Sequence, residues 1–88
     1  MKLVFNKRFL KDLAQIQVKE RSSIETFVFE TLLTYKALTD CKKIEKMKGY
    51  KSFYKVRFGD YRIGLRYEND VIVLERVLHR KEIYRFFP

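Results

Sequence analysis

Apolar and charged side chains alternate most regularly between Phe53 and Tyr67, on both sides of Gly59-Asp60. Gly-Asp is a turn signal, and the flanking runs are rich in the aromatic and β-branched residues that strands favour. The pattern therefore predicts a β-hairpin folded about this turn. The predicted register pairs Phe58 with Tyr61, Arg57 with Arg62, Val56 with Ile63, Lys55 with Gly64, Tyr54 with Leu65 and Phe53 with Arg66.

This register gives the hairpin one apolar and one basic face, because successive side chains of a strand point to opposite sides. Like charges placed opposite each other cost stability, so the pairing of Arg57 with Arg62 indicates an anionic ligand. A slip by one residue would mix the faces, so the pattern specifies the register. The apolar face carries Tyr54, Val56, Phe58, Tyr61, Ile63 and Leu65, and the basic face carries Lys55, Arg57, Arg62 and Arg66 beside Phe53 and Gly64.

Before the hairpin, a short strand at residues 2–5 is followed by apolar residues at helical spacing. Asn6 suits the N-cap of a first helix, and Ser22 with Glu25 fits a capping box that would start a second helix at Ser22. We expect both helices to form a hairpin on the apolar face of the sheet. Their apolar stripes are Phe9, Leu10, Leu13, Ala14 and Ile16, then Ile24, Phe27, Val28, Leu32 and Tyr35.

A loop is expected at residues 39–41 and turns at Gly49 and at residues 68–70, and residues 71–78 read as a central strand. Simple alternation would place Arg76 on the same face as Ile72, Leu74 and Leu78. The element order predicts an α+β domain spanning residues 1–88. Its two-helix hairpin would pack on one face of a mainly antiparallel four-stranded sheet (β-α-α-β-β-β), followed by a short C-terminal tail or helix.

The chain carries a formal net charge of +9, and residues 42–88 hold +7 of it. Such asymmetry favours a polyanion or an acidic protein as partner, with a merely soluble basic protein as the alternative. Cys41 is the single cysteine, so no internal disulfide can form and a reducing cytoplasm fits. We expect no membrane span and no signal peptide, because no long apolar run exists and the N-terminus is charged early.

Helices on the apolar face would leave the basic face open, and the tail could bring His79, Arg80 and Tyr84 to one end of it. Arginine forks bind phosphate, and aromatic rings stack on single-stranded bases. The spacing of acids needed for Mg²⁺ is missing, as are a Ser/His/Asp set and a glycine-rich phosphate loop. RNA supplies its own nucleophile, the 2′-hydroxyl, so cations and one proton acceptor would suffice to cleave it without a metal ion. Lys55, His79 and Tyr84 are the candidates for proton transfer. A phosphate-binding face without catalysis is the alternative.

Residues 47–50, 53–63 and 78–84 together resemble the RelE branch of the RelE/ParE toxin superfamily. The Tyr-Arg pair after the hairpin turn and the His-Arg…Tyr tail are the most specific parts of this resemblance. Carried over by position, Lys55 and Arg57 match the basic pair on the first hairpin strand and Arg62 the phosphate-binding arginine. The tail residues His79, Arg80 and Tyr84 complete the implied catalytic set, which needs no metal or other cofactor.

The carboxylate base is the one role of the family's site that has no clear match in this sequence. Some members of the family place a carboxylate base in the pocket. Glu45 is the nearest candidate for that role here, and Asp60 sits in the turn. RNA contacts are expected from residues around the catalytic set. The expected RNA-binding residues are Lys48, Lys51, Phe53, Arg66 and Lys81.

The resemblance implies a toxin of a type II toxin–antitoxin system that cuts mRNA in the A site of the 70S ribosome and inhibits translation. Its partners would be a cognate acidic antitoxin, mRNA and the ribosome, in a bacterial or archaeal cytoplasm. ParE relatives share the fold, generally lack this catalytic set and act on DNA gyrase, so fold alone does not decide the function. The alternatives are therefore a ParE-like toxin that binds gyrase and a non-catalytic RNA-binding module.

Overall fold

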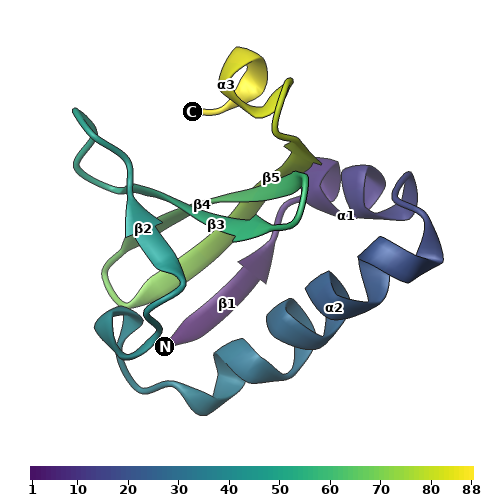
Figure 1. Cartoon of the computed structure of the whole chain (residues 1–88). Coiled ribbons are helices and arrows are strands. Elements are labelled where there is room, and N and C mark those ends of the chain that lie inside the picture. Colours follow the sequence, from purple (N-terminus) through teal and green to yellow (C-terminus); the bar gives the residue numbers. More distant parts are fainter.

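A five-stranded mixed sheet forms the centre of the molecule, with its strands in the order β1-β5-β4-β3-β2 (Figure 1). The structure is a computed structural model and describes all 88 residues. The strands are β1 (Lys2–Phe5), β2 (Ile44–Lys46), β3 (Phe53–Phe58), β4 (Tyr61–Glu68) and β5 (Val71–His79). β1 pairs in parallel with β5, and every other pair is antiparallel. The predicted α+β class is confirmed, but the sheet has five strands rather than four because the short β2 joins its edge.

The predicted hairpin is present as β3 and β4, and all six predicted residue pairs are found. Gly59 has a φ of +57°, a left-handed conformation that glycine adopts without strain. Val56, Ile63 and Leu65 are fully buried on the apolar face. The next turn is also as expected, since Asn69 and Asp70 both have positive φ, as in a tight hairpin turn.

Both predicted helices exist, but the second begins earlier than its sequence suggests, and it ends at Phe29, before the predicted stripe residues Leu32 and Tyr35. In α1 (Lys7–Ala14), the Asn6 side chain caps the helix by accepting a hydrogen bond from the Arg8 backbone N–H. The predicted capping box at Ser22 is wrong: α2 (Val18–Phe29) starts five residues earlier, with the extended Gln17 at the N-cap position in place of Ser22. Gln17 makes no side-chain cap; the first-turn residues of α2 are exposed, so water can satisfy their backbone amides.

Short helices connect the remaining elements. The chain passes from α2 through η1 (Thr31–Thr34) and η2 (Leu38–Asp40) to the edge strand β2, so the loop expected at 39–41 begins as a helical turn. The predicted C-terminal tail or helix is α3 (Ile83–Phe86). None of these helices has the length and apolar character needed to cross a membrane.

The core lies between the sheet and the pair α1 and α2, which Figure 1 shows together on one side of the strands. A second, smaller apolar cluster lies on the opposite face, where Met47, Ile83 and Phe87 are buried against Phe53 and Leu78. The face expected to be open is therefore partly covered by the C-terminal tail. The main core includes Phe9, Leu13, Ile24, Phe27, Val28, Leu32, Val56, Ile63, Leu65, Ile72, Leu74 and Val77.

A β-bulge at Glu75 changes the direction of the side chains along β5. Leu65 pairs with Leu74 and Gly64 with Arg76, so Glu75 is an extra residue on β5. The predicted alternation is wrong in consequence: Leu74 is in the main core, whereas Arg76 lies on the face that carries the tail.

Candidate active site

The candidate active site centres on a contact between Lys55 of β3 and Tyr84 of α3. Lys55 Nζ donates a hydrogen bond of 2.9 Å to the Tyr84 hydroxyl, and it lies 5.4 Å from the centre of the Tyr84 ring. Lys55 is half-buried, while Tyr84 is 59% exposed. A pocket of about 380 Å³ opens here, and it is lined by Met47, Lys48, Tyr50, Lys55, Tyr84, Phe87 and Pro88.

Two arginines lie beside this pair on the same face of the hairpin. Arg57 is two residues after Lys55 along β3 and pairs directly with Arg62 on β4. The Arg62 guanidinium is fixed by the turn, because its Nη1 donates to the backbone oxygens of Gly59 at 2.7 Å and Tyr61 at 2.9 Å. Those contacts use one nitrogen and leave Nε and Nη2 for a ligand. The arrangement suits an anion with several oxygens, such as a phosphate.

Arg80 joins the same end of the sheet through the hairpin turn. Its backbone N–H donates to the Asp60 carbonyl at 2.7 Å, and its Nε lies 3.6 Å from an Asp60 carboxylate oxygen. Both side chains are more than half exposed, so this ion pair contributes little to stability. The backbone hydrogen bond keeps Arg80 at the turn that also holds Arg62.

Glu45 is a candidate base whose position in the fold the sequence does not predict. It pairs with Lys55 across β2 and β3, and its carboxylate lies 3.6 Å from Arg57 Nε. A carboxylate therefore does lie next to the basic residues of the candidate site. A strand of three residues is too short to show an alternating pattern, and Ile44 is its one apolar signal.

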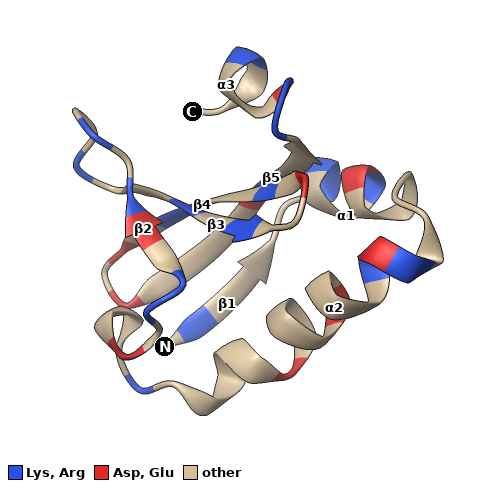
Figure 2. Cartoon of the chain, viewed as in Figure 1, with Lys and Arg blue, Asp and Glu red and all other residues tan.

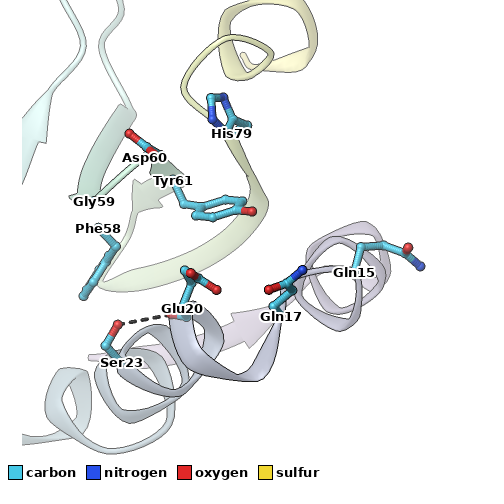
Figure 3. Close-up of a pocket in the computed structure, with 9 residues that line it drawn as sticks. All are labelled: Gln15, Gln17, Glu20, Ser23, Phe58, Gly59, Asp60, Tyr61 and His79. Carbon is cyan, nitrogen blue, oxygen red and sulfur yellow. Dashed lines mark hydrogen bonds between the residues drawn. The ribbon is translucent and has the colours of Figure 1, made fainter.

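His79 lies on the other face of the sheet, away from Lys55 and Tyr84. It pairs with Tyr61, and the two rings are 5.7 Å apart. Its Nδ1 accepts a hydrogen bond from the Lys81 backbone N–H. Figure 3 shows His79 and Tyr61 at a groove of about 500 Å³ opposite residues 15–23 of the helical side. The structure thus does not bring His79 together with the rest of the predicted catalytic set.

The expected RNA-binding residues fall into three groups. Lys48 lines the pocket, and Lys51 is exposed in the loop before β3, where Gly49 has a φ of +86°. Phe53 instead packs edge-on against the rings of Tyr50 and Phe87. The remaining two are Arg66, which lies 3.2 Å from Glu75, and Lys81, which is exposed before α3.

The pair Asp12–Arg76 is a partly buried feature of this face that the sequence does not indicate. Arg76 Nε and Nη2 donate to the two Asp12 oxygens at 2.7 and 3.0 Å, and Asp12 also accepts from the Val77 backbone N–H. The hydrogen bond to Asp12 raises the pKa of the Arg76 guanidinium above its ordinary value. β1 pairs with β5 only as far as Leu74, so the rest of β5 has no neighbouring strand on that side. α1 packs there instead and brings Asp12 next to Arg76.

Charge dominates the chemistry of the candidate site. Figure 2 shows Lys and Arg along β3, the loop that precedes it and the segment that leads into α3. No three side chains of His, Cys, Asp or Glu gather closely enough to hold a metal ion. The site can therefore bind and neutralise a phosphate through cations, with Lys55, Tyr84 and Glu45 as groups able to exchange protons.

Comparison with known proteins places this chain among toxins. A family described as ParE toxin of type II toxin–antitoxin system, parDE, matches residues 3–84. The chain is 43% identical over 89 residues to Toxin RelE3 of Methanocaldococcus jannaschii, with complete coverage of both proteins.

Solved structures of toxins of this kind resemble the chain as well. The crystal structure of the RelB–RelE antitoxin–toxin complex from Methanococcus jannaschii contains a chain that is 41% identical, with a TM-score of 0.78 and coverage of 97% of this chain and 99% of that one. The toxin–antitoxin complex RelBE2 from Mycobacterium tuberculosis shares the fold at 20% identity, with a TM-score of 0.70 and 90% of each chain covered. The chain thus belongs to the RelE/ParE superfamily as a RelE-type toxin of a type II toxin–antitoxin system.

Proposed function

We propose that this toxin is an endoribonuclease that cuts mRNA in the ribosomal A site without a metal ion and so inhibits translation. The observation that carries the proposal is the contact between Lys55 and Tyr84, with Arg57 and Arg62 on the same face. A nuclease of this kind needs a proton acceptor beside a phosphate site, and Lys55 lies beside Arg57 and Arg62 on this face.

The proposed step is an attack of the ribose 2′-oxygen on the adjacent phosphorus. Lys55 Nζ, in its neutral form, takes the 2′-hydroxyl proton as the new O–P bond forms. Arg57 and Arg62 neutralise the charge that develops on the phosphate oxygens, with Arg80 at the nearby turn. The bond from phosphorus to the 5′-oxygen breaks, and that oxygen takes a proton from water. The products carry a 2′,3′-cyclic phosphate and a 5′-hydroxyl.

Tyr84 is well placed to orient the RNA in this step. Its ring is exposed and borders the pocket, so a base can stack on it. Its hydroxyl touches Lys55, which places it beside the 2′-hydroxyl in the proposed complex. His79 has no role in this proposal, because it lies on the other face of the sheet.

The ribosome is the proposed site of action because the pocket is small and the net charge of +9 suits a large polyanion. The proposed partners are the 70S ribosome with its mRNA and a cognate acidic antitoxin, in the cytoplasm. The relative from Methanococcus jannaschii was crystallised as a RelB–RelE complex, which supports an antitoxin of this type here.

A gyrase-binding toxin is the second candidate, because the matching family is described by the name ParE. Expression of the toxin in translating cells separates the candidates. Our proposal expects mRNA ends within codons that disappear when translation is blocked. Broken DNA with intact mRNA would support the ParE-like function, and bound but uncut RNA would support a non-catalytic RNA-binding module.

A further inference from the structure

Phe87 sits directly on Gly64, the residue that pairs with Lys55 in the sheet. A Cβ atom added to Gly64 would lie 2.6 Å from Cδ2 and Cγ of the Phe87 ring and 2.7 Å from Cε2. Real Cβ atoms essentially never approach this closely. The absence of a side chain at Gly64 is therefore what allows the Phe87 ring to lie on the sheet.

The ring of Phe87 is the main anchor of the C-terminal tail. It is 4% exposed, and it packs edge-on against Phe53 at 5.4 Å between ring centres. Its backbone N–H donates to the Ile83 carbonyl at 2.8 Å, which ties the anchor to the first residue of α3. Tyr84 follows Ile83 directly but is 59% exposed, so its own packing does not hold it in place.

A second contact fixes the direction of the tail. The Phe86 ring lies 5.5 Å from the Arg76 guanidinium, which Asp12 holds in turn. Phe86 is half exposed, so the contact orients the helix more than it stabilises it. Phe87 lies beside Lys55 and Phe86 lies against Arg76, and with α3 placed by these two contacts the Tyr84 hydroxyl lies on Lys55.

We propose that Gly64 and Phe87 form a latch that positions Tyr84 against Lys55. Both are positioning residues, because neither would touch the reacting atoms. The effect of the latch on catalysis rests on the proposed nuclease function. The latch itself is a property of the protein alone, so it can be tested without RNA.

The first test follows the tail directly in Gly64→Ala and Phe87→Ala. We expect trypsin to cut after Arg80, Lys81 and Arg85 faster in both variants, and amide exchange in residues 83–88 to rise. Exchange in β3, β4 and β5 should stay slow, because the main core is on the other face. The matched control is Leu33→Ala, which shortens an apolar side chain that is 65% exposed away from the tail. Protection of the tail equal to wild type in both variants would overturn the latch.

The second test measures single-turnover cleavage of mRNA on programmed ribosomes. We expect Gly64→Ala and Phe87→Ala to slow cleavage by about 10²-fold, the size of effect that a misplaced catalytic group produces. Tyr84→Phe should then add little in the Gly64→Ala background, although it slows the wild type. A released tail with an unchanged rate, or independent effects of Gly64→Ala and Tyr84→Phe, would refute the positioning role. If the wild type itself does not cut, the proposed function fails, and the tail measurements alone decide the latch.

Discussion

Asp12 and Arg76 form a bidentate, hydrogen-bonded ion pair that joins α1 to the bulge of β5. Their side chains are 12% and 17% exposed, so the pair is largely removed from water. Removal of one partner of such a pair leaves an uncompensated charge, which is strongly destabilising. The pair also holds the guanidinium on which Phe86 rests.

Asp12→Asn should therefore lower the free energy of unfolding by about 2–3 kcal/mol, less than a fully buried pair because some water reaches it. Urea unfolding followed by circular dichroism measures this change. The matched control is Glu25→Gln, which removes the partner of Arg21 in a helical pair that is more exposed than Asp12–Arg76 and should cost about 0.5 kcal/mol. Equal, small effects of both substitutions would show that Asp12 adds nothing beyond a surface pair.

Lys55→Met should slow single-turnover cleavage on programmed ribosomes by about 10²-fold or more, because the proton acceptor is lost. Lys36→Met, which removes an exposed lysine outside the candidate site, is the control and should leave the rate unchanged. If Lys55→Met keeps the wild-type rate and its pH profile, Lys55 is not the base and its charge alone matters.

Tyr84→Phe keeps the ring and removes the hydroxyl that touches Lys55. In the proposed step Lys55 becomes positively charged as it takes the proton, and a hydrogen bond from a charged group is worth about 1.5–3 kcal/mol, so we expect a loss in cleavage rate of roughly 10- to 100-fold. The same single-turnover assay measures it. A near-normal rate would assign Tyr84 to base stacking alone.

Arg62→Ala should slow cleavage by about 10²-fold or more, because one donor to the transition state is lost. Arg62→Lys should recover only part of the rate, since the planar fork is absent. Circular dichroism should show an intact fold, and Arg8→Ala, an exposed arginine on α1, serves as the control. Full activity in a folded Arg62→Ala protein would remove this residue from the site.

Binding of the proposed acidic antitoxin should weaken as salt rises, because the toxin carries a net charge of +9. Between about 0.1 M and 1 M salt the Debye length falls from about 10 Å to about 3 Å, so surface attraction is largely screened. Isothermal titration at several salt concentrations measures the effect. A tight complex whose affinity does not change with salt concentration would argue against binding driven by electrostatic attraction.

The hairpin can be predicted in full because two signals agree on its register. Gly59-Asp60 marks the turn, and the alternation of faces allows only one alignment of the strands. This alignment puts Lys55, Arg57 and Arg62 on one face of the hairpin, and the observed pairing of β3 with β4 confirms it. Their roles in catalysis stay a prediction.

Other features depend on contacts between distant parts of the chain, which a single sequence does not reveal. The bulge at Glu75 follows from how β4 and β5 pair, so local alternation assigns Arg76 to the wrong face. The docking of Phe87 depends on the missing side chain of Gly64, far away in the sequence. The short β2 has no pattern of its own, and so the position of Glu45 beside Lys55 could not be predicted.

The chemistry of the cut ends tests the central claim most directly. Purified toxin is added to ribosomes programmed with a defined mRNA, and the ends of both fragments are analysed. Attack by the 2′-hydroxyl must leave a 2′,3′-cyclic phosphate on the upstream fragment and a 5′-hydroxyl on the downstream one, with the cut inside the A-site codon. Fragments with a 3′-hydroxyl and a 5′-phosphate, or mRNA that stays intact, would contradict the account.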